Sequence, residues 1–233
     1  MFNDTRTTQG HSLRHPDNNN LHLHYDDTFE DLLLMIDKGP FVREYLAALK
    51  QTIELAMAEY PRVLAFRVDL RLPQAIDLPD YVYTNQVISD FFESFRRKIQ
   101  YHQAKVRERN GYARGCKVRY VWARELGQGG KPHYHVLILL NRDAYYRVGR
   151  LGSEKVNMIS RMEESWASAL GLSVGQVRGL VHIPENPEYR IDRYVRSGDL
   201  DELPALFRRS SYLCKKATKS FGDRQRCFDT SRG

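Results

Sequence analysis

Hydrophobic residues recur every three or four positions in several segments of the chain, which is the spacing of one helical face. Near the start, this pattern predicts two helices over 28–36 and 42–60, separated by Gly39 and Pro40. Further along, it predicts helices over 83–109, 153–170 and 201–219. We therefore expect amphipathic helices along much of the chain.

Apolar and polar residues alternate instead over 63–72, as they do in a half-buried strand. Two further strands are predicted over 117–125 and 133–140, and the glycine-rich stretch between them is typical of a hairpin loop. A short apolar strand is expected over 179–183. Hairpin strands are antiparallel, so the sequence predicts an α+β fold in which helices cover one face of a central, mainly antiparallel sheet.

The chain divides into three predicted parts. Residues 1–24 are polar and turn-rich and are expected to be disordered, 25–60 form a helical N-terminal extension, and 61–233 form the sheet-bearing domain. No segment has the roughly 18 apolar residues of a membrane-spanning helix, and the polar N-terminus has no apolar signal core. The three cysteines form no CxxC pair. These features indicate a protein of the cytoplasm with no membrane partner.

The charge balance is 36 Lys and Arg against 29 Asp and Glu, and the net charge of +7 is only a weak indication of an anionic partner. The distribution is more informative, because residues 25–60 sum to −5, 94–124 to +9 and 203–233 to +6. The two basic blocks could form one phosphate-binding face after folding, or each could be a solvated helix face. Charge alone does not separate these interpretations.

The sharpest local feature is the pair His133 and His135 at the start of a predicted strand. Residues two apart in a strand point to the same side, about 7 Å apart, so both imidazoles can reach one divalent cation. Glu125 lies just across the glycine-rich loop and would complete the set. Two nitrogens and a carboxylate leave positions open for water or phosphate, which suits Mg²⁺ or Mn²⁺. A His-x-His pair by itself is more often incidental, but Glu125 and the apolar strand favour a metal site.

A second candidate is Tyr212, followed by Lys215, Lys216 and Lys219. On the predicted helix over 201–219, all four would lie on one face. Nearby ammonium groups would favour the phenolate and neutralise charge in the transition state, so this tyrosine suits attack on a phosphodiester. The pattern also fits a tyrosine that packs inward and lysines that face water. With 14 tyrosines in the chain, the pattern alone does not select the nucleophile.

A third candidate is the polar face of the first predicted strand, made of Arg67, Asp69 and Arg71. These side chains alternate with apolar ones and so share one side of the strand. They could face nucleic acid or the metal, or form a half-exposed edge with local ion pairs.

In this order, the segments 63–72, 125–140 and 212–215 resemble the motifs of the His-hydrophobic-His (HUH) endonuclease superfamily, which includes rolling-circle replication initiators, relaxases and some transposases. More narrowly, Tyr-Val-Trp-Ala-Arg-Glu at 120–125 and Ser-Tyr-Leu-Cys-Lys at 211–215 look like the inovirus-type replication proteins. Those proteins are encoded by filamentous phages and by prophage or satellite elements of bacteria. The resemblance covers roughly residues 60–233.

The resemblance implies a metal-dependent nicking enzyme that initiates rolling-circle replication. Glu125, His133 and His135 would hold the metal, and Tyr212 would attack the scissile phosphate, leaving a 5′-phosphotyrosine and a free 3′-hydroxyl. Lys215 would stabilise charge or orient the phosphate. The chain departs from the family pattern in two ways: no second tyrosine lies within a turn of Tyr212, and Cys214 replaces an alanine, which leaves open whether Lys215 or Lys216 acts.

The expected partner is single-stranded or locally melted origin DNA, together with a helicase and a polymerase of the bacterial host. The cations expected to contact DNA are Arg67, Arg71, Arg124, Lys131, Lys216 and Lys219. Two other functions fit the same sequence. One is a non-catalytic protein that binds origin or operator DNA on the same fold. The other is a metal-dependent hydrolase of nucleotides or RNA that uses an activated water.

Overall fold

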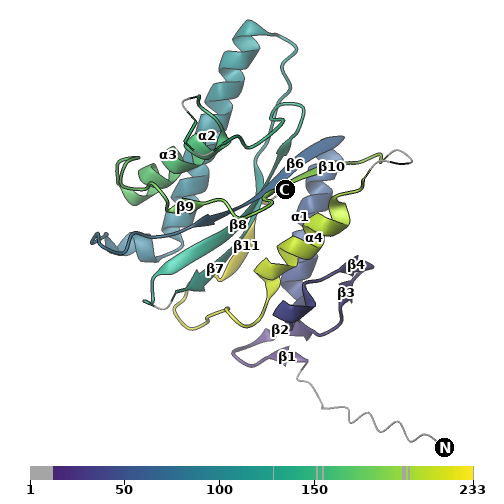
Figure 1. Cartoon of the computed structure of the whole chain (residues 1–233). Helices are drawn as coiled ribbons and strands as arrows, with labels where there is room; N and C mark the ends of the chain where they lie inside the picture. Colours follow the sequence, from purple (N-terminus) through teal and green to yellow (C-terminus); the bar gives the residue numbers. More distant parts are fainter. Residues whose placement is uncertain are drawn as a thin grey trace, which may run out of the picture.

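A central antiparallel sheet organises the fold (Figure 1). The computed structural model describes residues 13–127, 129–150, 152–153, 155–195, 198 and 200–232. The strand order is β10-β6-β8-β7-β11, and β9 pairs with the end of β6. The strands are β6 (Arg62–Leu70), β7 (Arg119–Leu126), β8 (Pro132–Asn141), β9 (Val181–His182), β10 (Glu188–Asp192) and β11 (Phe228–Thr230). The predicted class and the β7–β8 hairpin are confirmed, whereas β10 was not predicted.

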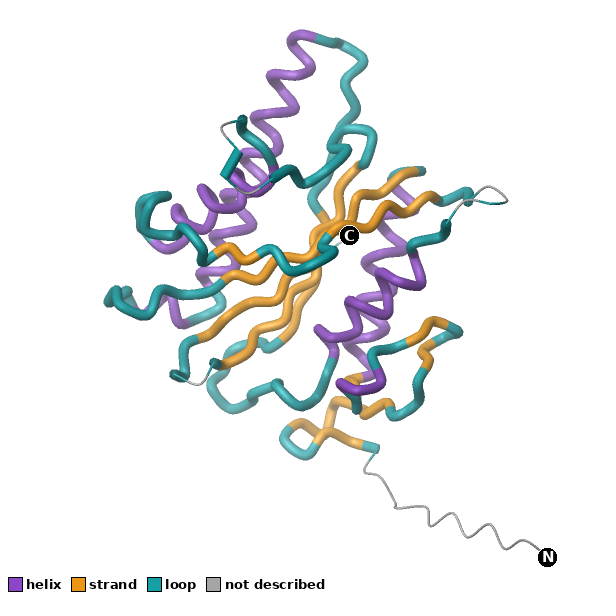
Figure 2. Tube along the Cα trace, viewed as in Figure 1, coloured by secondary structure: helices purple, strands orange, loops and turns teal. Residues whose placement is uncertain are grey.

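Helices cover both faces of this sheet (Figure 2). One face packs against α2 (Gln86–Arg109) and α3 (Met158–Leu170), and the other against α1 (Arg43–Glu59) and α4 (Leu203–Ser210). The prediction that helices cover one face was therefore wrong. The reason lies in the inner strands β6 and β8, which are buried along nearly their whole length, so both of their sides need an apolar cover.

Side-chain alternation separates the two layers of the core. In β6, Phe66 and Val68 pack with the α2–α3 layer, whereas Val63 and Ala65 pack with the α1–α4 layer. The same alternation in β8 places His133 and His135 on the side of Leu137, toward α1 and α4. The face on which the candidate site lies is therefore set by strand register.

The N-terminal segment forms small strands. They are β1 (Arg14–His15), β2 (Asn18–His24), β3 (Thr28–Phe29), β4 (Leu32–Leu33) and β5 (Phe41–Val42), with a 3₁₀ turn η1 at Ile36–Lys38. The prediction of disorder was thus wrong for residues 13–24, and residues 1–12 lie outside the described part. The helix predicted over 28–36 was also wrong, because Glu30 and Asp31 adopt positive φ angles of 47° and 66° and turn the chain into a β3–β4 hairpin.

The segment 25–60 shares its hydrophobic core with the sheet. Leu46, Leu49 and Ile53 of α1 are buried in the same cluster as Leu137 and Leu139 of β8. The helix predicted over 42–60 is confirmed as α1. The segment is therefore helical only in its second half, and that half forms part of the layer over the sheet.

An ion pair joins the end of α1 to β7. The guanidinium of Arg119, which is only 3% exposed, donates two hydrogen bonds to the Glu59 carboxylate, at 2.6 and 2.9 Å. Burial acts to raise the pKa of Glu59, but the bonds and charge of Arg119 outweigh it, and the pKa is lowered. The pair therefore favours the ionised carboxylate in the folded state.

We expect Glu59→Gln to lower the free energy of unfolding by about 2 kcal/mol at pH 7, because a buried cation loses its charged partner. Folding lowers the pKa of the Glu59 carboxyl below its unfolded value of about 4.3. The difference in free energy of unfolding between wild type and variant should therefore be complete above that pH and should disappear as the pH falls through the folded pKa. Urea titrations of both proteins between pH 7 and pH 3 measure this. A constant difference over that range would contradict the assignment.

The remaining helices follow the predictions with shifted bounds. Predicted helix 83–109 is α2, preceded by a 3₁₀ turn η2 at Asp80–Tyr83. Helix α3 begins at Met158, later than predicted, because Asn157 caps it by accepting a hydrogen bond from the Ser160 backbone N–H. It ends at Gly171 in the left-handed conformation, φ 67°. Within the described residues, no helix is long and apolar enough to span a membrane.

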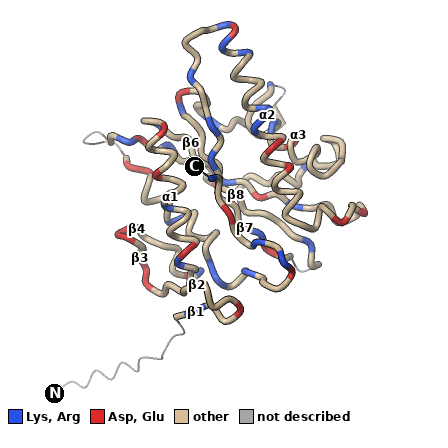
Figure 3. Tube along the Cα trace, turned by 180° about the vertical axis from the view of Figure 1, so that it is seen from behind, with Lys and Arg blue, Asp and Glu red and all other residues tan. Residues whose placement is uncertain are grey.

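The two basic blocks of the sequence do not merge into one face. The first contains most of the basic residues of α2, and the second contains α4 and the segment that follows it. These helices pack on opposite sides of the sheet. Along α2, basic residues alternate with acidic ones of α2 and α3 (Figure 3). The helical parts of the two blocks therefore do not form a single phosphate-binding face, although the end of the second block lies beside β7, where Arg124 of the first block pairs with Asp223.

Candidate metal centre

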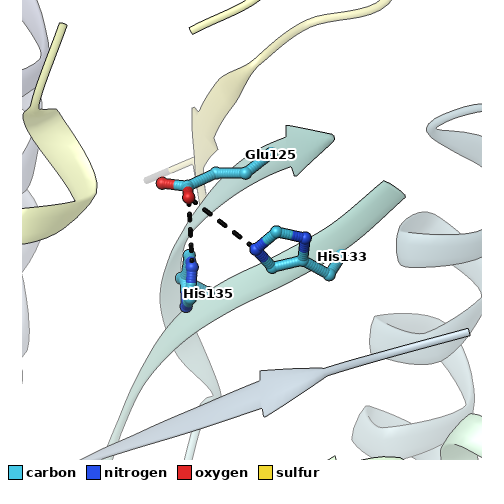
Figure 4. A group of neighbouring side chains, drawn as sticks. All are labelled: Glu125, His133 and His135. Carbon is cyan, nitrogen blue, oxygen red and sulfur yellow. Dashed lines mark ion pairs between the residues drawn. The ribbon is translucent and has the colours of Figure 1, made fainter. Parts of the chain in front are cut away.

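Three side chains converge where the β7–β8 hairpin closes. Glu125 in β7 pairs in register with His133 in β8, and His135 lies two residues further along the same face. One carboxylate oxygen, Glu125 Oε2, lies 3.7 Å from His133 Nε2 and 3.4 Å from His135 Nε2 (Figure 4). One ligand atom from each residue can be chosen so that all three lie within 4.8 Å of one another. The strand register thus brings the three predicted ligands together.

The carboxylate of this cluster is charged. Glu125 is 4% exposed, and burial acts to raise its pKa, but the neighbouring imidazoles of His133 and His135 and the hydrogen bond from Thr218 hold the pKa well below its usual range. Thr218 Oγ1 donates to Glu125 Oε1 at 2.6 Å, and Lys215 Nζ lies 3.3 Å from the same oxygen. One oxygen is therefore held by the protein, and the other faces the two imidazoles.

The residues present fit a divalent cation. His135 Nε2 is buried, and despite its 3.4 Å approach to Glu125 its geometry makes no hydrogen bond. A buried ring nitrogen without a hydrogen bond is costly unless another partner binds it. Two imidazole nitrogens and one carboxylate suit a divalent first-row transition-metal ion, and they leave coordination positions open. The donor set and the unpaired nitrogen both support a metal site.

Asp69 of β6 orients the ring of His135. It pairs in register with His135, and its Oδ1 lies 2.6 Å from His135 Nδ1. Burial acts to lower the pKa of His135, but its contacts with Asp69 and Glu125 outweigh this and raise the pKa. Because Nδ1 is bonded to Asp69, Nε2 is the nitrogen that faces Glu125. A carboxylate behind a ligating histidine is the usual support of a metal site.

The segment that carries Tyr212 is not a long helix. Helix α4 ends at Ser210, continues as a 3₁₀ turn η3 (Ser211–Cys214), and becomes extended at Lys215. The prediction that Tyr212 and the three lysines share one helical face was therefore wrong. The chain departs from the helix because Lys215 bridges to Phe41 of β5 and the Lys216 N–H donates to the Pro40 carbonyl. Backbone bonds to the N-terminal segment replace the next helical turn.

This turn nevertheless brings Tyr212 and Lys215 to the cluster. The Tyr212 ring meets the ring of His135 edge-on, with centroids 5.1 Å apart. Lys215 Nζ lies 3.5 Å from the Tyr212 ring centroid and also reaches Glu125. Tyr212, Asp69 and His135 line a pocket of about 250 Å³ together with Arg67. Of the two lysines left open by the sequence, Lys215 is the one whose side chain joins the cluster.

The predicted DNA contacts divide by location. Arg67 is 5% exposed and lies in the cluster, with its guanidinium carbon 5.3 Å from the Tyr212 ring centroid. Arg71 and Lys131 line a second pocket, of about 680 Å³, with His133 and His135. Lys131 Nζ is held by the carbonyls of Pro73 and Gln74. Arg67, Arg71 and Lys131 are therefore next to the Glu125–His133–His135 cluster, and Arg71 is the exposed one of the three.

Arg124 and Lys219 are not surface cations. Because side chains alternate along β7, Arg124 lies on the α2 face of the sheet, opposite Glu125. There its guanidinium donates hydrogen bonds to the Asp223 carboxylate and to the Tyr83 carbonyl. Lys219 is 7% exposed, its Nζ has no hydrogen-bond partner among the described residues, and burial lowers its pKa. Lys216 is half-buried beside the N-terminal segment. A DNA contact by Arg124 would require its ion pair to break.

Sequence reasoning missed two residues of the site. Asp69 was noted on the polar face of its strand but was not placed behind a histidine, because this requires the β6–β8 register. Thr218 was not noted at all, and no sequence signal distinguishes it. The sequence feature that could have indicated a role for Asp69 was its place on the polar face of β6.

Fold and site together define a mixed α+β protein with a candidate metal centre at the start of its central strand. The chain belongs to the YagK/YfjJ C-terminal domain family, whose model matches residues 24–231. It is 36% identical over 200 residues to "Uncharacterized protein YagK" of Escherichia coli (strain K12), covering 83% of this chain and 94% of that protein. It is 30% identical over 202 residues to "Uncharacterized protein YfjJ" of the same organism, covering 84% and 97%. No solved structure matches the chain.

Proposed function

We propose that the protein is a metal-dependent endonuclease that nicks one DNA strand through a tyrosine nucleophile and initiates rolling-circle replication of a phage or prophage element. The observation that carries the proposal is the convergence of Tyr212 and Lys215 on the Glu125–His133–His135 cluster, from segments nearly 80 residues apart in sequence. The resemblance to HUH endonucleases rests on these same residues. Cytoplasmic location in a bacterial host and DNA as partner belong to the proposal.

Glu125, His133 and His135 would hold the cation, Mg²⁺ or Mn²⁺. A bound cation would supply Lewis-acid polarisation of the scissile phosphate. The bond-making and bond-breaking steps would be carried out by residues of the protein. Tyr212 Oη forms the new bond to phosphorus, and the bond from phosphorus to the 3′ oxygen breaks. Tyr212 releases its proton, the departing 3′ oxygen takes one up, and the products are a 5′-phosphotyrosine and a free 3′-hydroxyl.

Arg67 and Lys215 suit the electrostatic part of this reaction. Their cationic groups lie over the Tyr212 ring, at 5.3 and 3.5 Å from its centroid. Positive charge that is fixed beside the attacking phenol stabilises the negative charge that builds up on the phosphate. Both side chains are over nine-tenths buried, so solvent screens them weakly.

The direct test is a covalent-adduct assay. Single-stranded oligonucleotides that tile the DNA of the encoding element are incubated with the protein and Mn²⁺. One oligonucleotide should give an adduct that survives denaturing electrophoresis, and EDTA should abolish it. A label at the 3′ end of the DNA should migrate with the protein, whereas a 5′-labelled fragment should be released with an extendable 3′-hydroxyl.

Other outcomes would favour the two alternative functions. Salt-sensitive DNA binding that is equal with Mn²⁺ and EDTA, without cleavage, would indicate a binding protein. Cleavage of nucleotides or RNA without an adduct would indicate a hydrolase that uses water. Failure of every tiled oligonucleotide to form an adduct with metal-loaded protein would contradict the proposal.

Asp69 should act as a positioning residue. Asp69→Asn keeps a hydrogen-bond acceptor for His135 but removes the charge behind the ring, and we expect Mn²⁺ affinity to fall about 10- to 100-fold. Titration calorimetry with Mn²⁺ measures this, and Asp77→Asn, at an exposed loop position, is the matched control. Unchanged affinity in Asp69→Asn, with an unchanged circular dichroism spectrum, would show that Asp69 does not support a metal ligand.

A further inference from the structure

A wide groove lies on the other side of the sheet from the Glu125–His133–His135 cluster. It has a volume of about 990 Å³ and is lined by α2 and α3 on the opposite face of the sheet. Pockets of 300–1,000 Å³ are the usual size for small-molecule ligands. Its lining includes basic, acidic and aromatic side chains, so this groove has the chemistry for specific recognition.

Arg161 of α3 is an unpaired buried cation in this groove. The residue is only 8% exposed, and it lines the groove. Its side chain has no hydrogen bond or ion pair with any described residue. None of its nitrogens is among the fully buried unpaired atoms, so the guanidinium opens to the groove. Such a group is best satisfied by two oxygens of one carboxylate or phosphate, and no described residue supplies them.

The other cations of the groove already have partners. Arg97 donates to Glu93, Lys98 lies 3.7 Å from Glu164, and Lys105 Nζ donates to Glu108 at 3.2 Å. These carboxylates are therefore occupied and do not neutralise Arg161. The pKa of His102 is lowered by burial and by the positive charge of Arg161. Among the described Lys and Arg residues that line the groove, Arg161 is the one without an acidic partner.

Apolar surface borders the same groove. Tyr101 and Val156 line it and are each 67% exposed, which is unusual for large hydrophobic side chains with a cavity beside them. The hydroxyl of Tyr145 contacts His102 Nδ1 at 3.1 Å, which fixes that ring in the groove wall. A ligand with an anionic end and an apolar or aromatic body would satisfy both kinds of surface.

We propose that the α2–α3 groove binds a small organic anion, with a phosphate or carboxylate paired to Arg161 and an aromatic or apolar body against Tyr101 and Val156. This site is separate from the metal cluster and does not depend on the proposed nicking activity. Phosphate and carboxylate present the same pair of oxygens to a guanidinium, so the test compares both.

The experiment measures thermal unfolding of the full chain with inorganic phosphate, phenyl phosphate or phenylacetate. At a concentration about 100-fold above its Kd, a ligand should raise Tm by roughly 5–10 °C. We expect phenyl phosphate or phenylacetate to bind at least tenfold more tightly than inorganic phosphate, and the stronger of the two identifies the anion. Arg161→Met should lose the shift, whereas Arg97→Gln, which removes an exposed and paired cation of the same groove, should keep it.

A second readout separates a ligand site from a structural role. Arg161 has no side-chain partner among the described residues, so Arg161→Met should unfold at the same or a higher temperature than wild type without ligand. A lower Tm for this variant would mean that the arginine stabilises the fold, and would overturn the proposal. So would equal ligand shifts in wild type and Arg161→Met, the absence of a shift with all three anions, or stabilisation by duplex DNA alone.

Discussion

Tyr212→Phe should abolish the covalent adduct, with a loss of at least about 1,000-fold, because the substitution removes the attacking oxygen. The ring itself remains, so its edge-on contact with His135 and its position beneath Lys215 and Arg67 should be kept. Metal affinity and Tm should therefore change little. The measurement is the rate of adduct formation on the 3′-labelled oligonucleotide with Mn²⁺.

Tyr194→Phe is the matched control. Tyr194 is 76% exposed and its only described contact is with Arg193, so its loss should leave the rate within about twofold of wild type. If Tyr194→Phe eliminated the adduct and Tyr212→Phe did not, the nucleophile would be misassigned. If cleavage survived in Tyr212→Phe without any adduct, the reaction would use water instead.

Glu125→Gln should lower Mn²⁺ affinity by at least about 100-fold. Loss of a supporting residue costs 10- to 100-fold, and a direct ligand should cost at least the upper end of that range. Glutamine keeps the size of the side chain but removes the only carboxylate among the three candidate ligands. Calorimetric titration with Mn²⁺ measures the effect, and adduct formation should fall in parallel.

Two comparisons keep this prediction testable. Glu54→Gln changes an exposed carboxylate of α1 and should leave metal affinity unchanged. Glu125 is buried beside Lys215, so Glu125→Gln could impair folding, and His133→Gln offers a half-buried ligand whose loss perturbs the core less. Wild-type Mn²⁺ affinity in a folded Glu125→Gln or His133→Gln protein would show that the cluster is not a metal site.

The strand patterns in the sequence were sufficient to predict the inner strands β6, β7 and β8 of the sheet. The alternation over 63–72 predicted β6, and the glycine-rich hairpin predicted the β7–β8 pairing that places Glu125 opposite His133. Alternation also fixes which side of the sheet His135 faces. The metal cluster could be predicted because all three residues lie on one hairpin, where sequence spacing and spatial distance are closely related.

Features that depend on contacts between distant segments could not be predicted in this way. The apolar spacing over 28–36 fits a helix, but two residues with positive φ turn it into a hairpin. The spacing of Tyr212 and Lys215 also fits a helix, yet hydrogen bonds to Pro40 and Phe41 end it. Tyr212 and Lys215 were therefore identified correctly as neighbours, but for the wrong geometric reason.

The backbone link between β5 and Lys215 has a consequence for any change in the length of the N-terminal segment. The bridge from Phe41 to Lys215 and the bond from the Lys216 N–H to the Pro40 carbonyl hold the segment that presents Lys215 to Glu125. We expect an insertion near residue 40 to displace this lysine, even though it lies about 175 positions away in sequence. The family match over residues 24–231 spans both sides of the link.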